Sequence, residues 1–440
     1  CKGLLMNRPE LLSPAGSLQH MRFAFAYGAD AVYAGQPRYS LRVRENEFSR
    51  EDVLTKGIEE AHAQGKLFFL ASNIAPHNSK LKTYIDDLSP IIEMGPDALI
   101  MSDPGLIMMV REQWPDMPVH LSVQMNTVNA AAVKFWQSVG LERIILSREL
   151  SLGEVEEIRQ QCPDMELEVF VHGALCIAYS GRCLLSGYFN HRDPNQGTCT
   201  NSCRWDYKLK GEETDAGEVE GSQDFQAATR HENSQQVFLL EESNRPNDLM
   251  PIEEDEHGTY IMNSKDLRAV EHVHKLVNIG IDCLKIEGRT KSHYYAARTS
   301  QVYRQAIDDA VAGREFNPDL MGTLESLANR GYTDGFFVRH HSQELQRYQQ
   351  DASTSQRQLF VGETSGEINQ GGLTRVDVKN KIRVGDTLEL LTPGGNTRFQ
   401  LDSMQDMDGN AMQEAPGGGY QVWIPMPSDS GSFGLIARDV

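Results

Sequence analysis

One phrase recurs along the first two thirds of this 440-residue chain and constrains its fold more than any other feature. An apolar-periodic segment ends in glycine, and a polar residue then leads into a short apolar run. Glycine ends a helix because it adopts the left-handed conformation at little cost. The run that follows has the length and composition of a buried parallel strand. The clear copies are GADAVYAG (28–35), GPDALIMSD (95–103), GLERIILSRE (140–149) and GIDCLKIEGR (280–289), with GKLFFLASN (65–73) as a looser one.

Eight strands of this kind can be counted, which is the number that closes a (β/α)8 barrel. An open doubly wound sheet is the main alternative, but the first strand is followed by SPAGS (13–17), with one glycine, and not by G-x-G-x-x-G. We therefore predict an α/β fold, a TIM-like (β/α)8 barrel whose chemistry lies at the C-terminal ends of the strands. The strands are predicted at 10–14, 30–34, 67–71, 98–102, 119–123, 143–147, 167–171 and 283–287.

The long connection between the seventh and eighth strands contains four of the seven cysteines within 28 residues. They are Cys176, Cys183, Cys199 and Cys203, in the pattern C-x6-C-x15-C-x3-C. Thiols this crowded in a long chain without secretory features indicate a metal centre and not a disulfide framework. Structural zinc sites usually join paired ligands by shorter loops, whereas an iron–sulfur cluster needs four cysteines and tolerates varied spacing. The spacing favours a cluster, with zinc or unligated or catalytic thiols as alternatives.

The net charge of −20 is unevenly distributed, so it does not exclude RNA as a partner. Residues 207–258 hold 14 acidic and 4 basic side chains, which gives −10, and they have neither helical nor strand periodicity. This stretch is predicted to be an exposed, partly disordered insertion. There is no run of 18 apolar residues and no apolar segment of a signal peptide near the N-terminus. Together with the free thiols, this predicts a cytoplasmic protein without a membrane partner.

A second domain is predicted after the barrel, because the pattern changes from about residue 358 to alternating apolar residues and tight turns. The turns PGGN, DGN and PGGG indicate an antiparallel β-barrel of five or six strands. The predicted organisation is an N-terminal extension (1–5), strands one to seven with the cysteine segment (6–206), the acidic insertion (207–258), the eighth strand with closing helices (259–350) and the C-terminal domain (358–440).

Polar residues at the predicted strand ends are the candidate site residues. His172, Glu287 and Glu149 are candidate proton carriers. Arg148 and Arg289 have planar forks that match carboxylate or phosphate groups. Gln124, Asn73 and Tyr33 are further candidates for substrate binding. Each of these residues has an alternative interpretation as part of a structural polar network at the barrel rim.

The segment 293–313 is strongly helical and carries basic and aromatic residues together. Arg298 and Arg304 are interleaved with Tyr294, Tyr295 and Tyr303. Such a face could hold an RNA backbone and stack bases, or it could simply be solvated. Neither H-E-x-x-H nor G-x-S-x-G occurs, so the common hydrolase signatures are missing.

The chain resembles the U32 family, historically labelled peptidases. The resemblance rests on ELLSPAGS with GADAVYAG, on EVFVHGALCIAYSGRCLLSGYFNHRDPNQGTCTNSCRW, and on NSKDLRAVEHVHKL with LKIEGRTKSHYYAARTSQVYR. The segments DAVYAGQPRYSLRVRENEF and EMGPDALIMSDPGLIMMVRE are similar to its tRNA-modifying branch. The resemblance covers nearly the whole chain, apart from the acidic insertion and the first five residues.

The resemblance implies an enzyme that forms 5-hydroxyuridine at wobble position 34 of tRNA, on the route to 5-carboxymethoxyuridine. It implies prephenate as co-substrate in place of dioxygen, the anticodon arm as partner, and a [4Fe–4S] cluster on the four cysteines named above. Cys162 and Cys283 are the substitutes for the last ligand. Two alternatives stay open: a U32-type, collagenase-like peptidase that uses one cysteine, and a non-catalytic RNA-binding protein stabilised by zinc.

Overall fold

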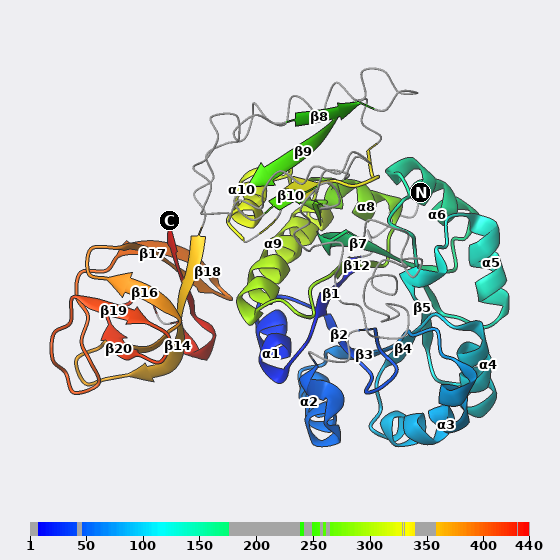
Figure 1. The fold of residues 1–440 in the computed structure, drawn as a ribbon, viewed down its shortest axis with the longest axis horizontal. Helices are drawn as coiled ribbons and strands as arrows, with labels where there is room; N and C mark the ends of the chain where they lie inside the picture. The colour runs from blue at the N-terminus through cyan, green and yellow to red at the C-terminus, as the bar shows by residue number, and fades with distance from the viewer. Residues whose placement is uncertain are drawn as a thin grey trace, which may run out of the picture.

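The computed structural model describes residues 8–41, 46–175, 238–241, 249–255, 258–260, 265–327, 329, 331–338, 358–428 and 430–439. Its larger part is a ring of parallel strands surrounded by helices, and a smaller all-β domain packs on one side of it (Figure 1). Among the described helices, none has both the length and the apolar character needed to cross a bilayer.

The eight parallel strands form a closed barrel, as predicted. Neighbouring strands pair in chain order, and the eighth strand of the ring pairs with both the seventh and the first. The fifth strand is shorter than predicted because the chain turns into a 3₁₀ turn at Val123–Met125. The strands are β1 (Glu10–Pro14), β2 (Ala31–Gly35), β3 (Leu67–Ser72), β4 (Ala98–Met101), β5 (Val119–Leu121), β6 (Arg143–Ile145), β7 (Glu166–Ala174) and β12 (Cys283–Ile286).

Helices follow these strands and cover the outside of the barrel. Several begin at side-chain caps, such as the capping box of Ser151 and Glu154, which satisfies free N–H groups of the first turn. The recurring glycines after the helices adopt the left-handed conformation, with φ of 106° at Gly28 and 85° at Gly280. The helices are α1 (Leu18–Ala26), α2 (Glu51–Ala63), α3 (Asn78–Glu93), α4 (Pro104–Gln113), α5 (Ala130–Ser138), α6 (Leu152–Gln161), α8 (Val273–Ile279), α9 (His293–Val311) and α10 (Asp319–Glu325).

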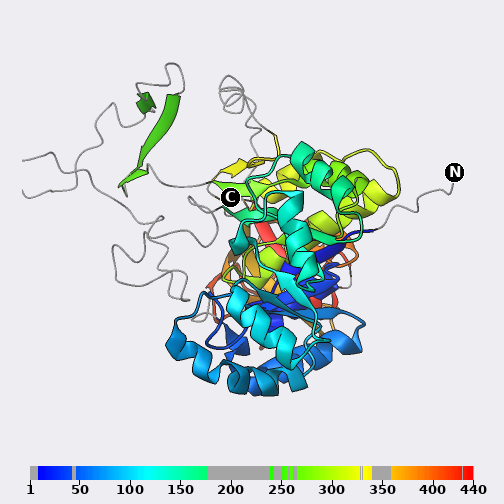
Figure 2. The ribbon, with the colours of Figure 1, turned by 90° about the vertical axis from the view of Figure 1, so that its right-hand side faces the viewer.

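Two short strands extend the sheet beyond the barrel and were not predicted. β11 (Asp266–Arg268) pairs antiparallel with β7, and β13 (Tyr332–Thr333) pairs parallel with β11. Strands of two or three residues are too short to show a period in the sequence. The acidic stretch, for which we expected no strand, contains most of a small antiparallel sheet that lies outside the barrel wall (Figure 2). Its strands are β8 (Phe238–Glu241), β9 (Leu249–Asp255) and β10 (Gly258–Tyr260).

The C-terminal domain is antiparallel, as predicted, but its pairing is that of two sheets and not of a closed barrel. The order in the larger sheet is β18-β17-β21-β14-β15-β20, and its outer strands β18 and β20 do not pair with each other in the described residues. Closure is prevented because β16 (Asn380–Arg383) leaves this sheet and pairs with β19 (Glu414–Gly417). The larger sheet comprises β14 (Gln358–Ile368), β15 (Thr374–Val378), β17 (Thr387–Thr392), β18 (Gly395–Gln400), β20 (Gln421–Ile424) and β21 (Leu435–Asp439).

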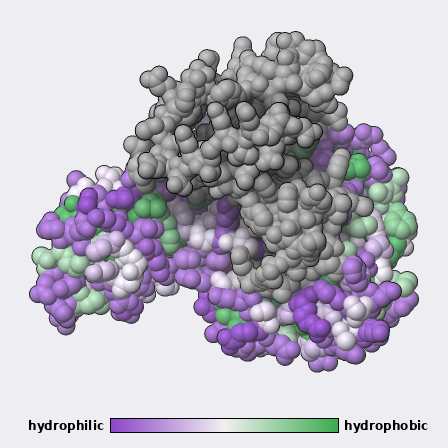
Figure 3. Space-filling model, viewed as in Figure 1, coloured by the Kyte–Doolittle hydropathy of each residue, from purple (hydrophilic) through white to green (hydrophobic). Residues whose placement is uncertain are grey.

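The C-terminal domain contacts α1 and α9 through side chains of both helices (Figure 1). The hydroxyl of Tyr27 donates to the carbonyls of Leu391 (2.9 Å) and Phe433 (2.8 Å). The ring of Tyr294 stacks on Phe360 with 4.9 Å between centroids. The core of the barrel continues into the domain through Leu391, Leu435 and Ala437. Mostly hydrophilic surface faces outward over α2, α3 and much of the C-terminal domain (Figure 3).

The prediction that α9 presents an RNA-binding or solvated basic face is wrong. Arg298 is 3% exposed and binds Glu389 of the C-terminal domain at 3.1 and 3.2 Å. Arg304 is also buried and pairs with Asp30 (2.8 Å). The three tyrosines of this helix are buried as well: Tyr294, Tyr295 and Tyr303. The basic residues of α9 therefore neutralise acids of the barrel and of the C-terminal domain.

Candidate active site at the barrel mouth

An ion pair between Arg148 and Glu287 joins the ends of β6 and β12. The guanidinium of Arg148 pairs with the carboxylate of Glu287 and donates to the carbonyl of Ala174 (2.9 Å). It also lies 3.9 Å from the ring centroid of Phe170, which is a close cation–π contact. Arg148 is 11% exposed and Glu287 25% exposed, so the pair is only partly removed from solvent.

The seam between β7 and β12 holds Glu287 in place. Lys285 pairs with Phe170 but Ile286 pairs with His172, so the register shifts and Val171 is the extra residue of a bulge in β7. The N–H of Glu287 donates to the carbonyl of His172 (2.8 Å), and its own carbonyl accepts from the hydroxyl of Tyr295 (2.8 Å). Gly173 has φ of 109°, and a Cβ there would lie 2.5 Å from the Glu287 carbonyl oxygen. The close approach of the two strands therefore requires glycine at this position.

Arg289 lies on the opposite side of β12 from the β7 seam, beside β1 and β2. Its guanidinium donates to the hydroxyl of Ser40 (3.0 Å) and lies 5.6 Å from the ring centroid of Tyr33. Two glycines make room for it. A Cβ on Gly16 would lie 2.2 Å from the carbonyl oxygen of Arg289, and one on Gly35 would lie 2.8 Å from its guanidinium. Gly16, the single glycine of SPAGS, therefore allows the backbone after β12 to approach closely.

Tyr33 lies inside the barrel and not on an exposed rim. Its side chain is buried, and its hydroxyl donates to the carbonyl of Ile286 (3.1 Å). Burial, with the nearby carboxylate of Glu287 as a smaller cause, raises the pKa of this phenol well above its usual value. Tyr33 therefore remains a neutral phenol, and its ring makes a cation–π contact with Arg289.

His172 is enclosed by aromatic rings. It lies 5.5 to 5.8 Å, centroid to centroid, from Tyr295, Tyr303 and Tyr332, and its Nδ1 is 3.3 Å from the hydroxyl of Tyr303. Burial, together with the positive charges of Arg268 and Lys291, lowers the pKa of His172 to about 3. A general acid or base works best with a pKa near the working pH. These surroundings favour the neutral form of the His172 imidazole. A role of His172 in proton transfer stays a prediction.

The other candidate residues lie at the same end of the barrel in separate contacts. Ser147 donates to the carboxylate of Glu149. The amide oxygen of Gln124 accepts from Ser122 (3.1 Å), and that of Asn73 accepts from the backbone N–H of Leu41 (3.3 Å). The hydrogen bonds of these three side chains run to Ser147, Ser122 and Leu41, and their roles toward a substrate stay predictions.

The four clustered cysteines, Cys176, Cys183, Cys199 and Cys203, lie outside the described residues. The chain enters that segment just after Leu175, at the end of β7, and so leaves from the barrel mouth. Within the described parts of the chain, no group of three or more histidine, cysteine, aspartate or glutamate side chains is arranged to hold a metal ion. Four thiols on a segment that starts at the mouth have the donor chemistry of an iron–sulfur cluster.

The two substitutes for the last cluster ligand are poorly placed. Cys283 is the first residue of β12, and Cys162 caps the C-terminus of α6, so both lie at the end of the barrel opposite the mouth. Both are buried, and burial next to Glu168 and Glu10 raises the pKa of the Cys283 thiol. Metal binding needs the thiolate, which this environment disfavours.

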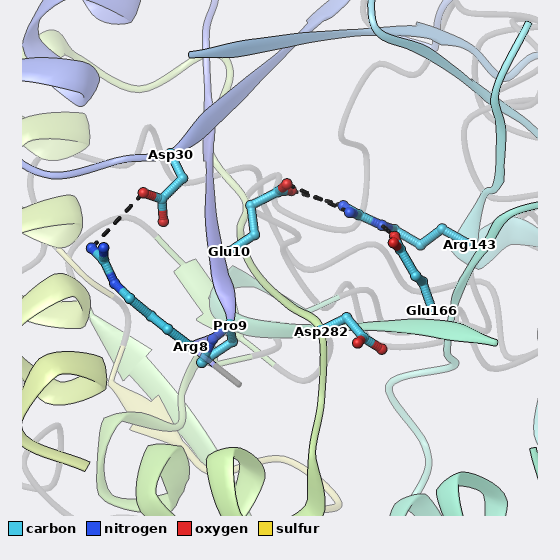
Figure 4. Close-up of a pocket in the computed structure, with 7 residues that line it drawn as sticks. All are labelled: Arg8, Pro9, Glu10, Asp30, Arg143, Glu166 and Asp282. Atoms are coloured by element: carbon cyan, nitrogen blue, oxygen red, sulfur yellow. Dashed lines mark hydrogen bonds and ion pairs between the residues drawn. The ribbon is translucent and has the colours of Figure 1, made fainter. Parts of the chain in front are cut away.

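A hollow of about 320 Å³ lies at that opposite end (Figure 4). Its charged residues are already paired with one another or with neighbours. Arg143 binds Glu10 and Glu166, both at 2.8 Å, while Asp30 pairs with Arg304. Residues at the N-terminal face of such barrels usually serve stability. We therefore place the candidate active site at the mouth and not in this hollow.

Sequence reasoning missed three buried residues beneath the mouth: Phe170, Glu168 and Lys285. The ring of Phe170 contacts the guanidinium of Arg148, and Lys285 binds Glu168 at 2.8 Å. A signal was present, because each charged residue interrupts an otherwise apolar strand in LEVFV and CLKIE. One acid and one base in two buried strands are expected to pair.

The fold and the polar strand ends place the chain among the (β/α)8 barrel proteins whose sites lie at the C-terminal face. The chain belongs to peptidase family U32. The model of Peptidase family U32 matches residues 16–347, and the model of the Peptidase family U32 C-terminal domain matches residues 356–438.

Similar proteins from three bacteria match this chain over most of their length. The chain is 62% identical to tRNA hydroxylation protein P of Escherichia coli (strain K12), over 99% of this chain and 97% of that protein. It is 58% identical to tRNA hydroxylation protein P of Haemophilus influenzae, over 98% and 96% of the two chains. It is 34% identical to tRNA hydroxylation protein P1 of Bacillus subtilis (strain 168), over 94% and 91%.

Proposed function

We propose that this chain is a tRNA uridine 5-hydroxylase that forms 5-hydroxyuridine at wobble position 34, the first step toward 5-carboxymethoxyuridine. In this proposal the reaction depends on prephenate and not on dioxygen. Family membership and the names of the similar proteins support tRNA hydroxylation. Two arginines at the barrel mouth support prephenate, a dicarboxylate, as the co-substrate. Arg148 and Arg289 each lie beside a buried aromatic ring.

The chemistry requires a redox group as well as side chains. Hydroxylation removes two electrons from the uracil, and C5 of uridine is neither electrophilic nor acidic. Acid–base side chains alone cannot supply this oxidation. The residues that would hold a [4Fe–4S] cluster are Cys176, Cys183, Cys199 and Cys203, and such a cluster supplies one-electron redox chemistry when bound.

The described residues supply binding and orientation. Arg148 and Arg289 would each bind one carboxylate of prephenate, and Glu287 holds the guanidinium of Arg148 in a fixed plane. Asn73 and Gln124 offer amide groups to the neutral edge of a base. Glu149, which accepts a hydrogen bond from Ser147, is a further candidate proton carrier.

We expect anaerobically purified protein to carry about one [4Fe–4S] cluster per chain, because four thiolates match its ligand requirement. Iron and sulfide analysis together with electronic spectra measures this. Stoichiometric zinc without sulfide in anaerobic preparations would contradict it and would favour the zinc-stabilised, non-catalytic alternative.

The function is tested by mass spectrometry of tRNA nucleosides from a strain that lacks the gene, grown anaerobically so that no dioxygen-dependent enzyme can compensate. We expect derivatives of 5-hydroxyuridine to disappear, to return with the wild-type gene, and not to return with Cys176→Ser. Unchanged nucleosides together with strong protein-cleaving activity would instead favour a peptidase.

Arg148→Lys is expected to raise the prephenate concentration for half-maximal modification about tenfold, equivalent to about 1.4 kcal/mol. Lysine keeps the charge and loses the bidentate fork that binds a carboxylate. Binding of tRNA should stay near normal if Arg148 binds a carboxylate of prephenate. Salt separates the two roles, because phosphate contacts weaken steeply with ionic strength whereas an enclosed carboxylate pair is screened much less. The rate is titrated against prephenate beside a tRNA-binding assay at two salt concentrations. Weaker tRNA binding with an unchanged prephenate dependence would overturn the assignment of Arg148.

A further inference from the structure

Lys285 lies under the candidate site and is hidden from solvent. It is 2% exposed, and its Nζ is 2.8 Å from the carboxylate of Glu168, which is itself fully buried. The same Nζ lies 4.4 Å from the ring centroid of Tyr33 and 5.3 Å from that of Phe170. One ammonium group therefore contacts two aromatic rings that belong to different strands, β2 and β7.

The same two rings also make cation–π contacts with the arginines of the mouth. The guanidinium of Arg289 lies 5.6 Å from the ring centroid of Tyr33, and that of Arg148 lies 3.9 Å from the ring centroid of Phe170. Lys285 is thus the shared cation between the two ring–arginine pairs. Each ring therefore contacts both the ammonium group of Lys285 and one guanidinium of the mouth.

The support continues below Lys285 to the far end of the barrel. Glu168 also lies 3.4 Å from Arg143, and Arg143 binds Glu10 at 2.8 Å. Above Lys285, the pairing register with β7 shifts at the next residue, and β12 then leads to Glu287, the partner of Arg148. Lys285 therefore lies between the buried carboxylate of Glu168 and the strand end that carries Glu287.

We infer that Lys285, held by Glu168, is a positioning residue that keeps Arg148 and Arg289 at the separation which two carboxylates of one ligand require. This inference rests on the proposed function, because it takes prephenate as the ligand. Lys285 itself does not touch the ligand. Its loss should weaken a dicarboxylate, which needs both arginines together, more than a monocarboxylate, which needs only one.

The test uses two variants of the full-length protein. Lys285→Met alone leaves the buried Glu168 with Arg143, at 3.4 Å, as its one remaining basic partner among the described residues, and is expected to be less stable. The double variant Lys285→Met/Glu168→Gln removes both charges and keeps similar volumes, so it should fold. Lys66→Met is the matched control, because Lys66 donates to the carbonyl of Ala29 (2.7 Å) near the opposite end of the barrel.

Calorimetric titration measures the binding of prephenate and of phenylpyruvate, which lacks the ring carboxylate, to anaerobically purified protein. We expect the double variant to bind prephenate at least about tenfold more weakly and phenylpyruvate less than threefold more weakly. Lys66→Met should bind both as wild type does. Wild-type affinity for prephenate in the double variant, or an equal loss for both acids, would overturn the role of Lys285.

The outcomes also separate this inference from the proposed function. In one outcome, the wild-type protein binds prephenate, the double variant does not, and loss of the gene leaves the tRNA nucleosides unchanged. That result would refute the proposed hydroxylase activity and would support the role of Lys285. Intact hydroxylation with unaltered prephenate binding in the double variant would remove the role of Lys285 alone. Wild-type protein without affinity for prephenate would overturn both.

Discussion

Gly173→Ala is expected to lower the free energy of unfolding by about 3 to 5 kcal/mol and to abolish activity. Gly173 has φ of 109°, where an L side chain is strained, and its Cβ would lie 2.5 Å from the carbonyl oxygen and 2.9 Å from the Cβ of Glu287. Relief of this overlap must separate β7 from β12, the pair that closes the barrel and holds the Arg148–Glu287 ion pair. Chemical denaturation measures the loss of stability.

Gly280→Ala is the matched control for this experiment. Gly280 also has a left-handed backbone, with φ of 85°, but a Cβ there meets nothing within 4 Å. Its replacement should cost only about 1 to 2 kcal/mol, which is the conformational part of the effect. Equal losses for the two variants would mean that the approach of the two strands at Gly173 can relax, and our account of the seam would be wrong.

Arg298→Met is expected to destabilise the protein by about 3 to 5 kcal/mol, because it leaves the carboxylate of Glu389 buried without its base. Arg298 is 3% exposed and makes two hydrogen bonds to Glu389 across the contact between α9 and the C-terminal domain. Thermal denaturation of the full chain measures the effect. The double variant Arg298→Met/Glu389→Leu should recover most of the loss, since no unpaired charge remains.

An exposed ion pair provides the comparison for Arg298. Arg398 pairs with Asp439 at 3.1 Å, but its side chain is 60% exposed. Arg398→Met should therefore cost less than about 1 kcal/mol. A similar loss for Arg298→Met and Arg398→Met would contradict the buried, domain-joining role of Arg298.

The barrel could be predicted from the sequence because its signals are local. Glycine after each helix and a short apolar run after each glycine report the conformation of a few neighbouring residues, as Gly28 and Gly280 illustrate. The burial of α9 could not be predicted in the same way. Arg298 finds Glu389 91 residues away, and Arg304 finds Asp30 274 residues away, so the helix reads as exposed and basic when it is viewed alone.

The candidate site was predicted in part for the same reason. The barrel rule identifies which end of each strand carries the site, and this placed Arg148, Glu287 and Arg289 at the mouth. It does not identify the partner of each residue. The structure pairs Glu287 with Arg148, which lies 139 residues away in the sequence. The pairing of β12 with β7 shifts in register after Lys285, and no local pattern in CLKIE indicates that shift.

Closure of the barrel between β12 and its two neighbours has a consequence for biosynthesis. β1 ends at Pro14 and its partner β12 begins at Cys283, so the first strand waits for about 270 further residues before that edge is covered. At about 5 to 20 residues per second, this interval lasts roughly 15 to 55 s. During it, β1 exposes an unpaired backbone edge on a ribosome-bound chain. The nascent protein is therefore expected to depend on chaperones until β12 has left the ribosome, and the C-terminal domain, which docks on α1 and α9 together, can attach only after that moment.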